Sequence, residues 1–173
     1  MATTYTLISS QTLASSAASV TFSAIPSTYT DLCIKYSVRG SDSLTQSNLK
    51  MSFNSDVTGY GTTNINGDGS AAASQRSTSA ANMSHRAGID AAGSTANTFA
   101  NGEIYIPNYT GSTAKPISFF SGQETNAATT AYISATAGLS TVTTAAITSI
   151  ILTPSVGNFV ADSTFYLYGI KSS

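Results

Sequence analysis

The single histidine is the first residue whose chemistry must be weighed. His85 follows Ser84, and Asp90 comes five positions later. A serine, a histidine and an aspartate are the side chains of a hydrolase triad, but a triad also needs a presented nucleophile and an oxyanion hole. The chain has no Gly-x-Ser-x-Gly elbow, and a serine-rich sequence places a serine near any histidine. We therefore expect no catalytic residues and no enzyme activity, with His85 and Arg86 as polar contacts in a loop.

Three carboxylates, Asp56, Asp68 and Asp90, are of the type that binds hard cations. Their spacing does not match an EF-hand loop, and isolated acidic residues are common in turns. We expect neither a metal site nor a bound cofactor. Asp56 instead fits a turn with Asn54, and Asp31 fits an acceptor for turn amides ahead of a strand, because short polar side chains bond to nearby backbone groups.

Two arginines fit a protein interface better than a catalytic site. Arg76 and Arg86 can each form a planar, bidentate pair with a carboxylate of a partner. Solvated loop arginines are the alternative interpretation. The full set of predicted partner contacts consists of these two arginines, the histidine and three tyrosines. The residues are Tyr60, Arg76, His85, Arg86, Tyr105 and Tyr109.

The tyrosines support a second interpretation, in which exposed rings stack on sugars. This needs several of them together on one exposed face, and the candidates are Tyr60, Tyr105, Tyr109, Tyr132, Tyr166 and Tyr168. The chain has no tryptophan, and alternation turns several of these rings toward a core. By parity Tyr105 faces outward with Glu103, whereas Tyr36 faces inward. Glycan binding is therefore the alternative function.

Composition limits the class of protein. Charged residues make up 9% of the chain and hydrophobic residues 41%, whereas ordinary soluble domains are about a quarter charged. The surface of a chain with so few charges is either solvated through hydroxyl and amide groups or covered by partner subunits. The net charge of -1 and the scattered Lys and Arg residues argue against a nucleic-acid partner. The lone Cys33 cannot form an internal disulfide, and we expect it in the core.

The length of 173 residues fits a single domain spanning 1–173 with one core. The N-terminal residues, from Met1 to Tyr5, show no secretory signal, so we expect synthesis in the cytosol. The most apolar stretch, Ala145 to Leu152, is too short to span a bilayer. We expect no membrane association.

Period-two alternation predicts an all-β fold. The clearest strands are Asp31 to Arg39 and Asn48 to Phe53, which we expect to be antiparallel neighbours. A turn is predicted from Ile25 to Tyr29, around Pro26. The other predicted strands are Tyr5 to Ile8, Ser19 to Phe22, Glu103 to Ile106, Ile117 to Phe120, Ala131 to Ala135, Ala146 to Leu152 and Thr164 to Ile170. About nine strands with half-polar faces and no amphipathic helix favour an antiparallel β-sandwich of jelly-roll type.

The segment from Thr58 to Asn97 is the exception to this pattern. It is dense in Gly, Ser, Ala and Asn, and its only large aliphatic residues are Ile65, Met83 and Ile89. We predict a long loop or interaction arm at 58–97, either disordered or ordered by a partner. A weak strand or a helical turn inside it is left open.

Several segments, in order, resemble one class of proteins. They are Thr12 to Pro26 followed by Tyr29 to Leu32 and Arg39, then Phe53 to Asp56, Ile106 to Tyr109, Gly157 to Phe159 and Phe165 to Ile170. In sequence and spacing they resemble small virion structural proteins of tailed bacteriophages, including phages of marine cyanobacteria. The resemblance covers nearly the whole chain except Thr58 to Asn97.

The resemblance implies a head decoration or cement protein that binds the outer surface of the assembled capsid and stabilises it. The major capsid protein and further copies of the chain, as a homotrimer, are the implied partners, and the virion is the implied location. A tail-fibre or head-appendage protein that recognises host-surface glycans is the alternative.

Overall fold

The computed structural model of the protein describes residues 4–126 and 130–171, which form twelve strands and no helix. The strands are β1 (Tyr5–Thr12), β2 (Val20–Phe22), β3 (Asp31–Val38), β4 (Gln46–Phe53), β5 (Tyr60–Gly67), β6 (Ala72–Ala80), β7 (Met83–Asp90), β8 (Ala100–Ile106), β9 (Lys115–Glu124), β10 (Ala131–Ser140), β11 (Ile150–Pro154) and β12 (Thr164–Ile170). Within this described part, no helix is long and apolar enough to cross a membrane. The expectation of no secretory signal was based in part on residues Met1 to Thr3, which lie outside the described residues.

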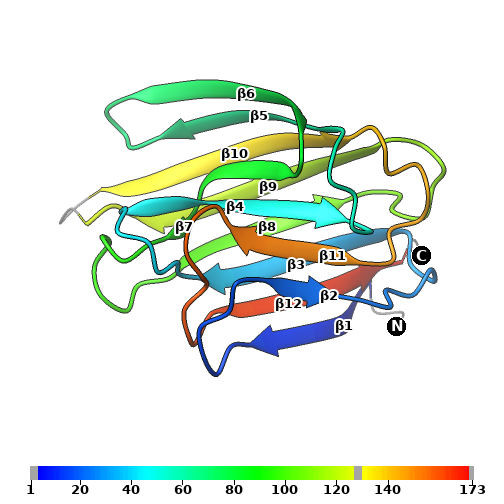
Figure 1. Cartoon of the computed structure of the whole chain (residues 1–173), viewed down its shortest axis with the longest axis horizontal. Coiled ribbons are helices and arrows are strands. Elements are labelled where there is room, and N and C mark those ends of the chain that lie inside the picture. Colours follow the sequence, from blue (N-terminus) through cyan, green and yellow to red (C-terminus); the bar gives the residue numbers. More distant parts are fainter. Residues whose placement is uncertain (1–3, 127–129, 172–173) are drawn as a thin grey trace.

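The strands form two antiparallel sheets that face each other as a β-sandwich (Figure 1). The larger sheet has eight strands in the order β1-β12-β3-β8-β9-β10-β5-β6, and the smaller has four in the order β2-β11-β4-β7. The small sheet covers one side of the large sheet, with β7 packed over β5, β9 and β10. The predicted all-β, two-sheet fold is confirmed, while the jelly-roll topology stays a prediction.

The core between the sheets comes from the alternation that predicts the strands. β3 turns Leu32, Ile34, Tyr36 and Val38 inward, and β4 supplies inward side chains of the same kind. Each of these residues is at most 4% exposed. Burial of one such side chain contributes about 1.5–3 kcal/mol, so this row holds the two sheets together. The inward orientation predicted for Tyr36 is confirmed.

β3 and β4 are both strands, but the prediction that they are neighbours is wrong. β3 pairs with β12 and β8 in the large sheet, whereas β4 pairs with β11 and β7 in the small sheet. The connection from Arg39 to Thr45 therefore crosses between the sheets. Period two defines which face of a strand is buried, but two strands of a sandwich bury the same kind of face whether or not they pair.

The prediction of a long loop at 58–97 is also wrong. This segment forms β5, β6 and β7, and β5 and β7 contribute buried residues to the interior. Its strands are built from Thr, Asn, Ser and Ala rather than large apolar residues, because the inner side of β5 packs in a polar part of the sandwich. Backbone pairing on both sides of β5, with β10 and β6, supplies the order that composition does not indicate.

Candidate functional site

The side of the eight-stranded sheet that faces away from the small sheet is here called the outer face. Strand register carries one row of side chains across the whole of it: Ser10, Tyr166, Lys35, Glu103, Phe120, Ala135, Ile65 and Ser74. The adjacent row is Leu7, Tyr168, Cys33, Tyr105, Ser118, Ala137, Thr63 and Arg76. The outer face is thus one continuous surface made by all eight strands.

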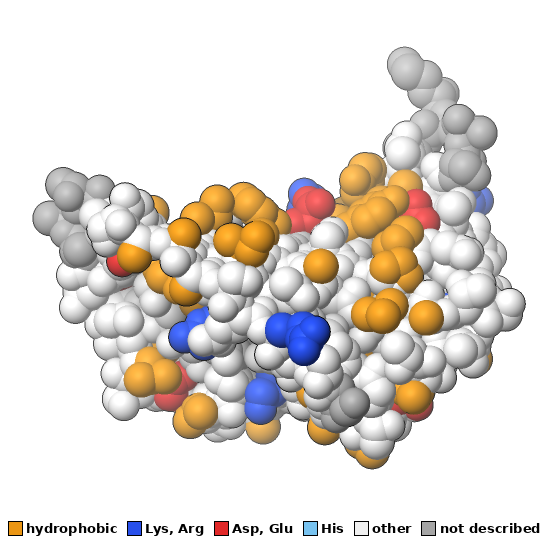
Figure 2. All heavy atoms as spheres, turned by 90° about the horizontal axis from the view of Figure 1, so that it is seen from above, with side chains coloured by type: hydrophobic (Ala, Val, Ile, Leu, Met, Phe, Trp, Pro, Cys, Tyr) orange, Lys and Arg blue, Asp and Glu red, His pale blue; other side chains and the backbone are white. Residues whose placement is uncertain are grey.

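This surface is rich in exposed apolar side chains. Within the described residues, eleven large hydrophobic side chains are exposed, and seven of them lie on the outer face: Tyr5, Leu7, Ile65, Phe120, Ile133, Leu139 and Tyr166. Seen from the β6 edge, this side of the molecule is hollowed and carries groups of hydrophobic side chains (Figure 2). Contiguous apolar surface of this kind marks interaction sites in soluble proteins.

β10 shows why the surface is apolar. Its outward residues include Ile133, Ala135 and Leu139, all exposed, whereas its inward residues Ser134 and Thr136 are buried. This is the reverse of the usual arrangement, in which a strand turns its apolar side to the core. The hydrophobic side of β10 is therefore exposed on the outer face.

A single ion pair lies near the middle of the outer face, and it is the only one in the described residues. Lys35 Nζ donates to Glu103 Oε2 at 2.6 Å, and this bond raises the pKa of Lys35. Both side chains are about half exposed. With Asn101 and Phe120 they line an open hollow over the backbone of Gly102. The pair leaves the face without net charge at its centre.

At the β1 end of the face, aromatic rings gather. Tyr5 and Tyr168 meet edge to face with their centroids 6.2 Å apart. Tyr105 donates to Asp31 Oδ2 at 2.7 Å, which raises the pKa of the phenol to about 12. The outward orientation predicted for Tyr105 is confirmed. Cys33 lies between Tyr105 and Tyr168 in the register and is fully buried, and burial raises its thiol pKa to about 11.

Asp31 has the turn-stabilising role predicted for it. Its Oδ1 accepts a hydrogen bond of 2.7 Å from the backbone N–H of Asn108, while Oδ2 accepts from Tyr105. These bonds join the start of β3 to the turn after β8. The carboxylate thus fixes the position of the Tyr105 ring on the outer face.

His85 is not placed for catalysis or for partner contact. It is fully buried on the inner side of the sandwich, with Nδ1 2.7 Å from Thr136 Oγ1 and Nε2 2.6 Å from Ser121 Oγ. The ring stacks on Phe119. Burial lowers its pKa to about 4, so it is neutral at neutral pH. Its two hydroxyl partners and lack of solvent access make it a structural residue.

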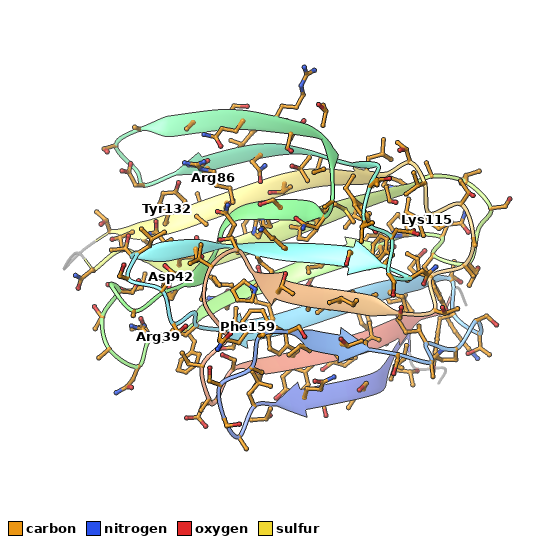
Figure 3. The ribbon with its side chains drawn as sticks, viewed as in Figure 1. Arg39, Asp42, Arg86, Lys115, Tyr132 and Phe159 are labelled. Carbon is orange, nitrogen blue, oxygen red and sulfur yellow. The ribbon has the colours of Figure 1, made fainter. Side chains whose placement is uncertain are left out.

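The other predicted contacts divide into buried and exposed residues. Tyr60 and Tyr109 are fully buried: Tyr60 accepts from the backbone N–H of Phe53, and Tyr109 donates to the carbonyl of Pro26. They contact the protein's own interior instead of a partner. Arg76 is exposed on the outer face, while Arg86 donates to Gln75 on the inner side of the β5–β6 hairpin (Figure 3).

The three carboxylates weighed as cation ligands lie in separate environments. Asp56 accepts from Thr143, Asp68 accepts from the backbone of Ser70 and Ala71, and Asp90 accepts from the backbone of Glu124. In the part of the chain that the structure describes, no group of three or more His, Cys, Asp or Glu side chains is arranged to hold a metal ion. Each carboxylate instead stabilises a local turn or strand end.

Sequence reasoning missed the residues that dominate the outer face. Phe120, Ile133, Leu139 and Ile65 were absent from the predicted contacts, although their strands, apart from β5, were predicted. A signal was present in β10, where apolar and hydroxylated residues alternate from Ala131 to Ser140. This alternation predicts that β10 has an apolar face and a polar face. Which of the two faces points outward depends on the tertiary structure.

Comparison with models of known protein families, with curated proteins and with solved structures finds no match to this chain.

Proposed function

We propose that this chain is a structural protein of the virion of a tailed bacteriophage and that it decorates the outer surface of the assembled head. The observation that carries the proposal is the apolar outer face of the eight-stranded sheet. A face of this kind is costly to leave in water and fits a subunit that is covered by its neighbours in an assembly. The low charge of the chain agrees with the same use.

The size of the outer face is sufficient for a stable contact. Eight strands spaced about 4.8 Å apart, each rising about 3.3 Å per residue, give a face of about 35 by 25 Å, or about 900 Å². Stable interfaces bury about 800 Å² on each partner. One copy docked through this face therefore has enough area to remain bound to a capsid lattice.

Stabilisation of the head would follow from mass action. A protein that binds the assembled lattice, but not its dissociated subunits, lowers the free energy of the assembled state. A copy that bridges neighbouring capsomers gains further from effective concentration. The major capsid protein is the proposed partner, and the chain would be synthesised in the host cytoplasm before it joins the virion.

Immunogold labelling of intact virions tests the location. Label over the whole head supports decoration, and label confined to the tail or one vertex contradicts it. The surface is tested by adding purified chain to heads that lack it and measuring the bound fraction. The double variant I133D/L139D should lose binding at least tenfold, while V57D, which alters an exposed loop residue outside the outer face, should bind like the wild type.

A second function is favoured by the aromatic end of the outer face. Tyr105, Tyr166 and Tyr168 share this face, and the neighbouring hollow combines the exposed ring of Phe120 with Asn101 and the Lys35–Glu103 pair. A ring beside amide, carboxylate and ammonium groups has the chemistry to bind a host-surface glycan. Binding on a glycan array that is lost in F120A and kept in I65A would support this alternative over decoration.

A further inference from the structure

β6 forms a free edge of the large sheet. β6 is the last strand of the large sheet, and its main packing partner is β5 (Figure 1). Every side chain from Ala72 to Arg76 is exposed. The backbone N–H and C=O groups on the side away from β5 therefore face outward along a long strand.

Monomeric proteins usually block such an edge with lysine, proline, a bulge in mid-strand or a very short strand. β6 spans nine residues, contains neither lysine nor proline and has Arg76 as its only charge. Its one irregularity lies toward its C-terminal end, opposite the step from Tyr60 to Thr62, so Ala72 to Ser77 stay regular. β1, at the other edge, is interrupted by a bulge between Leu7 and Ser9. Of the two edges of the large sheet, β6 is thus the one more open to strand addition.

We infer that β6 pairs antiparallel with β6 of a second copy of this chain, which joins two eight-stranded sheets into one continuous sheet across a two-fold axis. An antiparallel strand edge is complementary to its own copy, and two-fold contacts are the commonest in homo-oligomers. The net charge of -1 per chain gives little repulsion between copies. The small Ala and Ser side chains along β6 leave room for the two strands to approach.

Charge excludes one register of this pair. An axis through Arg76 would set the two Arg76 side chains directly opposite each other, which is destabilising. An axis through Gln75 places Arg76 of each copy opposite Ser74 of the partner copy, on the outer face. It also pairs Ala73 with Ser77 and avoids the irregular end of β6. We place the centre of the proposed pair at Gln75, the register that the variants below test.

Sedimentation velocity of the purified chain measures the assembly directly. The expected species at micromolar concentration has about twice the chain mass of 17.7 kDa. A monomer at all concentrations up to 100 micromolar would overturn the inference. A trimer would also overturn it and would support the homotrimer implied by the resemblance.

A matched pair of variants locates the contact. S74E places a carboxylate opposite Arg76 of the partner copy and should tighten the dimer about three- to tenfold, while S74K places a like charge there and should weaken it by a similar factor. S118E and S118K make the same changes on β9 of the outer face, away from the edge, and should leave the dimer unchanged. Equal dissociation constants for S74E and S74K would contradict the register.

Cross-linking gives a readout that does not depend on affinity. Q75C should form a disulfide-linked dimer on oxidation because the two Cys residues would face each other at the axis, and S118C should not. The native Cys33 is fully buried and does not compete. A linked S118C dimer without a linked Q75C dimer would reject β6 as the contact. The outcome is independent of head labelling, so this inference and the decoration function can fail separately.

Discussion

The buried histidine makes stability depend on pH. The pKa of His85 is about 4 in the folded chain and 6.5 without burial, so the unfolded chain takes up a proton that the folded chain resists. Its stabilising effect is complete above about pH 6.5 and is lost as pH falls toward 4. The loss amounts to about 3 kcal/mol. Urea unfolding at a series of pH values should show this decline.

The variant H85Q is the control for this prediction. Glutamine keeps hydrogen-bonding capacity toward Thr136 and Ser121 but does not titrate, so the decline between pH 6.5 and 4 should become much shallower. The comparison uses the slope with pH, since the substitution also changes the absolute stability. An unchanged slope in H85Q would assign the acid sensitivity to other groups.

Arg39 fixes a loop through hydrogen bonds to backbone carbonyls. Its Nη1 donates to the carbonyls of Thr95 and Thr98 at 2.9 Å each, and its Nη2 donates to the carbonyl of Ser94 at 3.1 Å. Hydrogen bonds that involve a charged group contribute about 1.5–3 kcal/mol each. Without Arg39 these carbonyls would lack a hydrogen-bond donor at a place that water reaches poorly. R39M should therefore destabilise the fold by about 2–4 kcal/mol.

Hydrogen exchange can localise this effect. In R39M, amides between Ala91 and Phe99 should exchange faster than in the wild type. Amides of β3 that pair with β12 should lose only the protection that the lower global stability of the variant accounts for. R39K should be intermediate because lysine offers one compact donor group instead of a planar fork. Uniform loss of protection throughout the chain would contradict a local clamp.

At the residue scale, the sequence predicts local roles better than exposure. Tyr105 could be assigned to an outward position because parity within one strand decides it. Asp31 could be assigned to a turn from its residue type and its place ahead of a strand, although the amide that it accepts from, that of Asn108, lies far away in the sequence. Tyr60 and Tyr109 could not be placed, since their burial depends on Phe53 and Pro26, contacts formed after the sheets assemble. His85 likewise owes its burial to residues on β9 and β10.

At the element scale, the two sides of the β9–β10 pair should respond differently to the same substitution. I117A removes a buried side chain on the inner side and should cost about 2–5 kcal/mol. I133A makes the same change on the outer face and should cost less than about 1 kcal/mol. Chemical denaturation of both variants measures the difference. Equal costs would mean that the outer face is covered within the isolated chain.

Strand prediction succeeds where large residues alternate and fails where small ones do. All nine predicted strands are present, and Thr164 to Ile170 has the observed bounds of β12. β5, β6 and β7 were missed, and in β5 and β6 the reason is that Thr, Asn, Ser and Ala provide almost no contrast between the two faces. β5 is ordered by pairing with β10, which lies more than sixty residues away in sequence, and β6 by pairing with β5.

At the scale of the whole molecule, the composition of the outer face predicts how docking responds to salt. The Lys35–Glu103 pair is internally neutralised, and the rest of the central row is apolar or hydroxylated. Binding to heads should therefore change by less than about threefold between 0.05 and 0.5 M NaCl. Calorimetry should give a negative heat-capacity change, the mark of apolar burial.

A strong salt dependence of head binding would direct attention away from the apolar and neutral centre of the outer face. The charged candidates would then be Arg76 and Lys50, which lie on opposite sheets. Comparison of R76A and K50A at low salt would separate the two surfaces. The prediction for the outer face requires both variants to bind within about twofold of the wild type.

The position of β12 between β1 and β3 has a consequence for how the protein is made. β1 pairs only with β12, and β3 pairs with β12 and β8, so until Ile170 has been synthesised β1 has no partner strand and β3 has one. Pairings over such sequence distances also close slowly. A nascent or truncated chain therefore exposes two open strands at once. Newly synthesised chains should therefore depend on chaperones until β12 has been made and has paired with both strands.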